Sequence, residues 1–180
     1  PTLMAAVTHL NPIKYLKKIA KVAVFGFSTS SSAATLPLNQ KTVTEELGVS
    51  DEIASFVLPM GMTINMDGTA IMQTIAAIFV ASCGGYEVTF GSVIVIALLA
   101  LVASIGTPAA PGAGAVILFT ILSGMGYVNE GALMAYSLIL AINRPIEMLV
   151  TSLNVVGDST TALYVAKSEG MLNEEIFNQD

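Results

Sequence analysis

The stretch Asn65-Met66-Asp67-Gly68-Thr69 interrupts a hydrophobic segment that is long enough to cross a lipid bilayer. Asp67 is the only charged residue between Ile53 and Gly85. A charge at the centre of a bilayer costs about 2.5–3.5 kcal/mol on insertion scales, so it is rarely kept without a task. Asparagine and glycine at the same place favour a break in the helix. The pentapeptide therefore predicts a broken transmembrane helix with a buried acid, which is typical of a cation or substrate site.

The composition indicates an integral membrane protein that contacts lipid. Hydrophobic residues make up 54% of the 180 residues and charged residues only 11%, whereas soluble domains carry roughly 25% charged residues. The formal net charge of -6 argues against a nucleic-acid partner, which would require clustered lysine and arginine. The chain starts with Pro1 rather than methionine, so we expect it to be the C-terminal part of a longer protein.

Two polar interruptions divide the chain into two units, each consisting of a hairpin followed by a helix. The first runs from Ser28 to Pro37 and is rich in hydroxyls, and the second places two prolines and three glycines between Gly106 and Gly114. The apolar arms beside them are shorter than the roughly 20 residues that a span requires. We therefore expect re-entrant hairpins, which are tolerated where they are buried in protein or line a wet cavity. A serine-rich surface linker and an external loop between two ordinary spans remain the alternatives.

The fold class we expect is an all-α integral membrane protein with a pseudo-two-fold repeat, although no repeat is visible in the letters. Secondary transporters often use such repeats, with half-helix tips near the membrane midplane. The expected segments are the end of a preceding transmembrane helix (1–11), a first re-entrant hairpin (12–48), a broken transmembrane helix (50–84), a second re-entrant hairpin (88–126), one long amphipathic transmembrane helix (130–166) and a C-terminal tail (167–180).

Polar residues of the last helix follow a helical spacing. Glu147, Thr151, Asn154 and Asp158 are separated by four, three and four residues, which places them on one face. Hard cations prefer oxygen ligands from carboxylates and backbone carbonyls. Asp158 together with a helix unwound near Asp67 would offer both, which predicts a sodium site. The alternative is that the two acids are buried in neutral form or paired with Arg144.

The hairpin tips offer hydroxyls and unpaired backbone N–H groups, and neighbouring helix N-termini favour anions. A zwitterion would suit such a site, with its carboxylate at a tip and at the Asn154 amide and its ammonium group at Glu147. No enzyme constellation is visible, because His9 is the only histidine and the sequence has no Cys/His cluster or phosphate-binding loop. We therefore expect a non-enzyme that does not itself use ATP.

Four motifs resemble, in their order along the chain, the dicarboxylate/amino acid:cation symporters. This is the glutamate transporter (sodium:dicarboxylate symporter) family, with its archaeal aspartate transporter homologues. The motifs are Ser30 to Pro37, Asn65 to Thr69, Ser104 to Thr107 with Pro111 to Ala115, and Asn154 to Asp158. The resemblance covers about residues 11–170. It implies the mobile transport domain of an elevator-type homotrimer in the plasma (inner) membrane, with multiple passes, an N-terminal trimerisation scaffold missing here, and the second hairpin as the gate.

The resemblance also implies site residues. One sodium site would use Gly61, Asn65, Asn154 and Asp158, a second the carbonyls of Thr63, Ser104, Ile105 and Thr107, and a third Asn65 and Asp67. The substrate, an amino acid or a dicarboxylate, would contact Ser32, Thr69, Ala110, Gly114, Glu147, Thr151 and Asn154.

Three positions depart from the pattern of the acidic transporters. Those proteins have aspartate at Glu147 and arginine at Val150, and some bacterial and archaeal members have arginine at Ser30 instead. Arg144 is the only arginine of this chain, and helical spacing directs it away from Val150. A substrate side-chain carboxylate would lack a bidentate partner, so we expect a neutral amino acid. The rivals are a proton-coupled symporter of dicarboxylates, with protons replacing sodium, an ion channel, and an inactive truncated fragment.

Overall fold

The computed structural model describes residues 4–5 and 8–179. The expectation of a preceding helix at 1–11 falls partly on residues 1–3 and 6–7, which lie outside the described residues, as does residue 180 of the tail. Within the described part the chain is all-helical, with one isolated β-bridge between Val49 and Leu172. The helices are α2 (Pro12–Thr29), α3 (Ser32–Glu45), α4 (Asp51–Ile64), α5 (Asp67–Cys83), α6 (Phe90–Ile105), α7 (Ala113–Gly124), α8 (Glu130–Ile142), α9 (Arg144–Ser168) and α10 (Glu174–Asn178).

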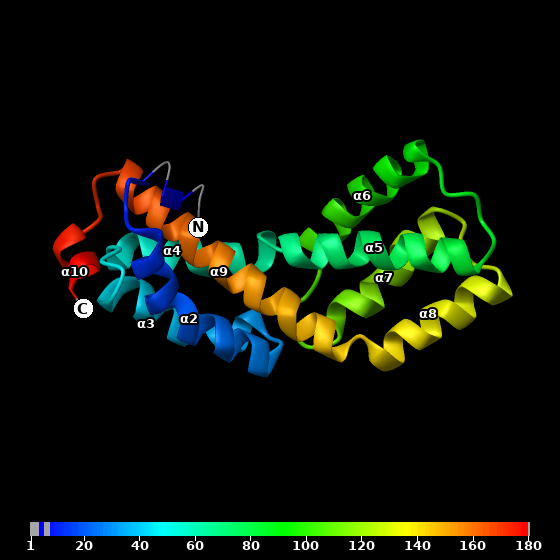
Figure 1. Ribbon diagram of the computed structural model, residues 1–180, viewed down its shortest axis with the longest axis horizontal. Helices are drawn as coiled ribbons and strands as arrows, with labels where there is room; N and C mark the ends of the chain where they lie inside the picture. The colour runs from blue at the N-terminus through cyan, green and yellow to red at the C-terminus, as the bar shows by residue number, and fades with distance from the viewer. Residues whose placement is uncertain (1–3, 6–7, 180) are drawn as a thin grey trace.

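The helices gather around two hydrophobic cores at opposite ends of an elongated molecule (Figure 1). The first core joins α2, α3, α4, α10 and much of α9, with Tyr15 and Phe177 fully buried. The second joins α5, α6, α7 and α8 around residues such as Ile96 and Leu118. The helical run Asp51–Cys83, which passes from one core to the other, is long and apolar enough to cross a membrane, and α8 with α9 would form a second span if counted together. The break at Asn65 and Met66 therefore lies between the two apolar bodies.

Serine and asparagine side chains set the first turn of several helices. Ser30 ends α2 in the left-handed conformation, with φ 50°, and Ser31 caps α3 by accepting the N–H of Ala34. Asn11 and Ser50 cap α2 and α4 in the same manner. Such a cap stabilises a helix by about 1 kcal/mol. Of the hydroxyl-rich stretch from Ser28 to Pro37, Ser30 and Ser31 alone form the turn, while the rest is helical and Pro37 lies inside α3. The two helices α2 and α3 pack against each other.

The helix that carries the opening pentapeptide is broken, as its residues predict. Asn65 ends α4 with φ -85° and ψ 79°, and α5 begins at Asp67 after the non-helical Met66. Neighbouring glycines allow the close approach of α9 at this point. A Cβ atom on Gly157 would lie 2.6 Å from Asn65 Nδ2. The break therefore depends on small residues that are far apart in the sequence.

The last segment differs from the single long helix expected over 130–166. The structure divides it into α8 and α9, which are bent by 69° at Asn143. Pro145, in the first turn of α9, has no N–H to continue the α8 ladder, and its ring would clash with the carbonyl of Ala141. The backbone carbonyl of Asn143 instead accepts the N–H groups of Ile146 and Glu147. The bend allows α8 to pack in the second core while α9 crosses towards the first (Figure 1).

Residues 171–178, which we call the strap, follow α9 and pack against the end of α3 and the start of α4. The Ser50 N–H donates to the Met171 carbonyl at 3.2 Å, and the Asn173 N–H donates to the Gly48 carbonyl at 2.7 Å. Phe177 inserts into the first core. The segment that the sequence indicates only as a tail is therefore part of the folded body.

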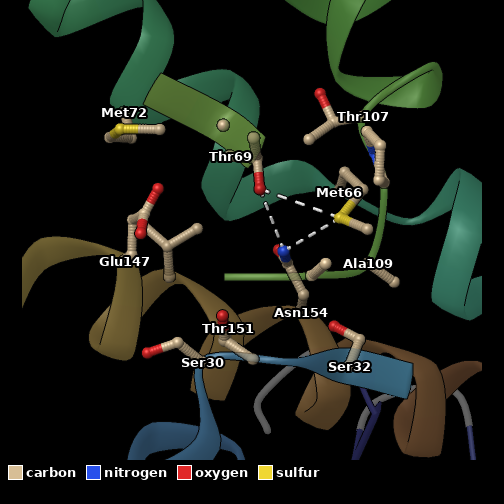
Figure 2. A pocket seen from close by; sticks show the side chains of 14 residues that line it. Ser30, Ser32, Met66, Thr69, Met72, Thr107, Ala109, Glu147, Thr151 and Asn154 are labelled. Carbon is tan, nitrogen blue, oxygen red and sulfur yellow. Dashed lines mark hydrogen bonds between the residues drawn. The ribbon is translucent and has the colours of Figure 1, made fainter. Parts of the chain in front are cut away.

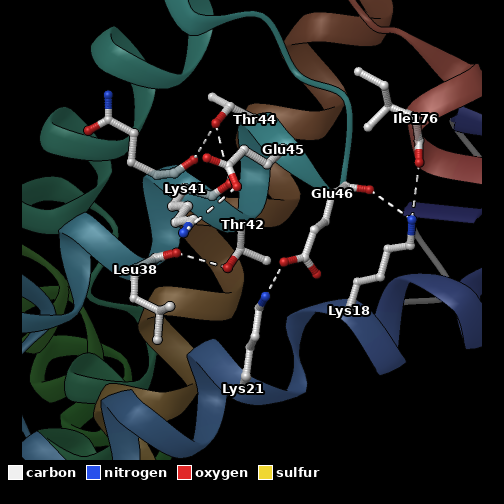
Figure 3. Close-up of polar contacts among 10 residues, drawn as sticks. Lys18, Lys21, Leu38, Lys41, Thr42, Thr44, Glu45, Glu46 and Ile176 are labelled. Carbon is white, nitrogen blue, oxygen red and sulfur yellow. Dashed lines mark hydrogen bonds and ion pairs between the residues drawn. The ribbon is translucent and has the colours of Figure 1, made fainter. Parts of the chain in front are cut away.

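The Lys18 side chain links this strap to α2 and α3 by hydrogen bonds (Figure 3). Its Nζ atom donates to the carbonyl oxygens of Glu46 at 2.9 Å and Ile176 at 3.2 Å, which Figure 3 shows. It also donates to the Phe177 carbonyl at 2.9 Å. One ammonium group thus satisfies carbonyls at the C-terminal ends of α3 and α10. Lys21, one helical turn later, makes only a surface ion pair with the Glu46 carboxylate.

Replacing Lys18 with methionine should destabilise the protein by about 1.5–3 kcal/mol, because three carbonyls lose a charged donor. Lys21→Met is the matched control and should cost no more than about 1 kcal/mol, the usual range of an exposed ion pair. Denaturant unfolding of the full-length protein in detergent measures both variants. Equal losses in the two variants would show that Lys18 has no special role.

Candidate functional site

A small cavity of about 30 Å³ lies between the two cores, where the two tips, the broken helix and α9 come together (Figure 2). It is lined by Ser30, Ser32, Met66, Thr69, Met72, Thr107, Pro108, Ala109, Ala110, Gly114, Glu147, Val150, Thr151 and Asn154. The structure therefore brings together all seven residues expected to contact a substrate. They come from five separate elements of the chain, so no single stretch of sequence forms this cavity.

Asn154 links α9 to the start of α5. Its Oδ1 accepts the backbone N–H of Gly68 at 2.9 Å, and its Nδ2 donates to Thr69 Oγ1 at 3.1 Å and to the Met66 sulfur at 3.3 Å. Asn154 is only 3% exposed. Its amide thus satisfies an N–H group that the helix break leaves without an intrahelical partner.

Asp158 and Asn65 form a second polar contact, one turn further along α9. Asn65 Nδ2 donates to Asp158 Oδ1 at 2.8 Å and to the Asn154 carbonyl at 3.3 Å. Gly61 lies directly against the carboxylate, because a Cβ atom there would be 2.6 Å from Asp158 Oδ1. The four residues expected at the first sodium site are therefore neighbours: Gly61, Asn65, Asn154 and Asp158.

The remaining expected cation ligands differ in how far they are buried. Thr63 and Asp67 are exposed, and the Thr63 hydroxyl donates within α4 to the Met60 carbonyl. Ser104 is buried at the end of α6, where its carbonyl accepts the Thr107 N–H, while Ile105 is about half exposed. Of this set, only Thr107 lines the cavity.

Glu147 forms one wall of the cavity and is 8% exposed. Its Oε2 atom accepts the backbone N–H of Gly112 at 3.0 Å and lies 3.6 Å from Arg144 Nη1. Arg144 therefore pairs with Glu147 and not with Asp67 or Asp158, and its side chain is 54% exposed. The single arginine is turned to the surface, away from the cavity.

Hydroxyl groups form the wall opposite Thr69 and Met72 (Figure 2). The Ser30 hydroxyl is buried without a hydrogen-bond partner among the described residues. Ser32 and Thr151 flank it and are 5% and 8% exposed. Val150 also lines the cavity, beside Gly68, and the lining residues include no lysine, arginine or histidine. This wall can accept and donate hydrogen bonds, but it offers no positive charge.

The two tips also contact each other directly. The Ser31 hydroxyl donates to the Ala109 carbonyl at 2.8 Å. The loop 106–112, which joins α6 to α7, thus lies over the cavity and rests on the first tip.

Sequence reasoning missed Met66 and Met72 as lining residues. Met72 follows Thr69 by three residues and so shares its helix face, and its Cε atom would lie 2.9 Å from a Cβ atom on Gly114. The spacing could have indicated Met72. Its chemistry could not, because methionine is equally common in the packing of apolar helices.

Comparisons with known proteins agree on one family. Residues 1–168 match the sodium:dicarboxylate symporter family model. The chain is 38% identical over 162 residues to excitatory amino acid transporter 5 of Mus musculus, covering 90% of this chain and 28% of that protein. It is 38% identical over all 180 residues to excitatory amino acid transporter 1 of Homo sapiens, of which it covers 32%. A Caenorhabditis elegans excitatory amino acid transporter is 37% identical over 162 residues, which are 90% of this chain and 31% of that protein. The chain spans less than a third of the length of these relatives.

Proposed function

Because the chain belongs to the sodium:dicarboxylate symporter family, we propose that it forms the transport domain of a sodium-coupled amino acid symporter. The observation that supports this best is the cavity between the two cores, to which both tips, the broken helix and α9 each contribute polar groups. The names of the relatives describe amino acid transporters, which favours an amino acid over a dicarboxylate.

Sodium would bind beside the break. Gly61, Asn65, Asn154 and Asp158 supply one carboxylate with amide and backbone oxygens, the donor set that hard cations prefer. The missing side chain at Gly61 lets the Asp158 carboxylate lie against the α4 backbone, because a Cβ atom there would be 2.6 Å from Oδ1. These residues therefore fit the cation. The sets around Asp67 and around Thr63, Ser104, Ile105 and Thr107 are proposed as further sites, completed by segments outside this chain.

The substrate proposed is a neutral amino acid. Its ammonium group would bind Glu147, its carboxylate Asn154 and a tip, and its side chain would face Val150 and the hydroxyl wall. A second carboxylate there would be desolvated with no cation to pair with, which is costly. A small side chain, with or without a hydroxyl, would be accommodated without that penalty.

The fold proposal follows the same family. The α2–α3 pair (12–48) and the α6–α7 pair (88–126) would be re-entrant hairpins related by a pseudo-two-fold axis, with α4–α5 (50–84) and α8–α9 (130–166) as spans. The domain would move as an elevator within a homotrimer in the plasma (inner) membrane, against a scaffold from the rest of the full-length protein. The outer surfaces around the two hydrophobic cores are rich in exposed isoleucine, leucine and phenylalanine, which suits a domain that moves within lipid and against a scaffold.

Competitive uptake by the full-length protein in proteoliposomes tests the substrate proposal. Serine, alanine and threonine should compete in a sodium-dependent manner, whereas aspartate should not. Val150→Arg should raise the affinity for aspartate by about tenfold, because it supplies a charged donor to the second carboxylate.

Two results would count against this proposal. Strong preference of the unmodified protein for aspartate would exclude the neutral substrate. Uptake that follows a proton gradient without sodium would favour the proton-coupled rival. Leu153→Arg is the control for the arginine, since Leu153 is 53% exposed on the same helix and does not line the cavity.

A further inference from the structure

We propose that Glu147 is a positioning residue that latches the loop 106–112 over the cavity by capping α7 from the neighbouring helix α9. The hydrogen bond from the Gly112 N–H to Glu147 Oε2 joins two elements 35 residues apart in the chain. Gly112 is the N-cap residue of α7, and Thr107, Pro108, Ala109 and Ala110 of the same loop line the cavity. The latch therefore acts on the segment that separates the cavity from its surroundings.

The N-terminus of α7 needs a partner from outside its own segment. Gly112 has no side chain to cap the helix, and its φ of 85° is a conformation that favours glycine. The first N–H groups of a helix lack intrahelical acceptors and attract negative charge. The Glu147 carboxylate, which is almost fully buried, supplies both an acceptor and a charge at this position. Arg144, at 3.6 Å, balances that charge from the outer side.

The hydrogen bond between Glu147 and Gly112 depends on the length of the glutamate side chain. An aspartate at 147 would be shorter by one carbon–carbon bond, about 1.5 Å. The present distance of 3.0 Å would then exceed the range of a hydrogen bond unless the loop moved. The extra methylene group is thus matched to the position of the loop, and not only to the ligand.

The second carboxylate oxygen extends the role of Glu147 to the ligand, and this step rests on the proposed function. Oε1 lies on the cavity side, 3.9 Å from where a Cβ atom on Gly114 would stand. A substrate ammonium group can bind Oε1 while Oε2 keeps the Gly112 N–H. Recognition of the amine and closure of the loop would then share one side chain, so that binding favours the closed loop.

Hydrogen–deuterium exchange of the full-length protein, purified in detergent without sodium or amino acid, tests the latch directly. In Glu147→Asp the amides of residues 106–114 should exchange about tenfold faster than in the unmodified protein, because a charged hydrogen bond is lost. Glu147→Gln keeps the reach but not the charge and should increase exchange only about threefold. Glu147→Ala should increase exchange in residues 106–114 as much as Glu147→Asp does. The alanine variant thus provides an independent measurement if the aspartate variant fails to fold.

The matched control is Glu130→Asp, which shortens an exposed glutamate in the first turn of α8. It should leave exchange in residues 106–114 unchanged, and exchange in α4 should be unchanged in every variant. Exchange in the loop that is identical in the unmodified protein and in the Asp and Ala variants overturns the latch. Faster exchange that appears equally in α4 also overturns it, since that pattern indicates general loosening.

This experiment is independent of the transport proposal because it contains no ligand. A protein that binds no amino acid in sodium but shows the predicted exchange pattern would retain the latch and lose the proposed function. Adding serine and sodium to the unmodified protein provides the second arm, in which exchange in 106–114 should slow further. No slowing, despite measured serine binding, would contradict the shared role of Glu147.

Discussion

Asp158→Asn should weaken sodium binding by roughly 100-fold, the largest effect we expect on ligand affinity. The variant keeps the size of the side chain and an oxygen that can accept from Asn65 Nδ2, which lies 2.8 Å from Asp158 Oδ1. What it loses is the negative charge, in a place that is 3% exposed. Interactions with charged groups are worth about 1.5–3 kcal/mol, and more at low dielectric. Substrate affinity measured in sodium should fall as well, because binding of the two ligands is coupled.

Calorimetric sodium titration of the full-length variant, with and without serine, measures both losses. Asp51→Asn is the matched control, since Asp51 is exposed in the first turn of α4, and it should leave sodium affinity within about twofold. If Asp158→Asn shows the same sodium dependence as the unmodified protein, the assignment of the site to Asp158 is wrong.

Phe177→Ala should reduce the free energy of unfolding by about 3–5 kcal/mol, the usual cost of removing a buried phenylalanine. Phe177 is 0% exposed and packs in the core shared by α2, α3, α4 and α9. Its loss leaves a cavity and also removes the ring above which the Lys18 ammonium group lies, 5.7 Å from the centroid. The strap 171–178 should then detach from the Gly48 and Ser50 backbone.

Denaturant unfolding of the full-length protein measures this loss, and Phe90→Ala serves as its control. Phe90 is 82% exposed at the start of α6, so its removal creates no internal cavity. A loss for Phe177→Ala no greater than that for Phe90→Ala would show that the strap contributes little to stability.

The sequence was sufficient to predict the features that depend on local chemistry. The break at Asn65 follows from polar and flexible residues within an apolar run. The buried face of α9 follows from the spacing of Glu147, Thr151, Asn154 and Asp158, all of which are at most 8% exposed. Helical periodicity alone determines such a face.

Features that depend on packing between distant segments were not predictable. The bend at Asn143 requires Pro145, which was visible, but the direction of α9 depends on its packing against α2 and α4. The strap depends on the backbone carbonyls of Glu46, Ile176 and Phe177, which all accept from Lys18. Every residue has such a carbonyl, so the sequence does not indicate which ones Lys18 contacts. Glu147 was expected to bind a ligand, yet its contact with Gly112 depends on where the loop lies.

Among the described residues, two hydrogen bonds of 3.0 Å or less hold the loop 106–112 to distant segments of the chain, Ser31 to Ala109 and Gly112 to Glu147, and the Ala33 N–H adds a longer one of 3.5 Å to the Ala109 carbonyl. One neutral and one charged hydrogen bond together are worth roughly 2–4.5 kcal/mol. Without a ligand, the loop would then be detached for roughly 0.05–3% of the time. If a solute enters only while the loop is detached, its observed association rate is reduced by the same factor of about 30 to 2,000. The strength of these contacts would thus determine the fraction of time in which the cavity is open to solutes.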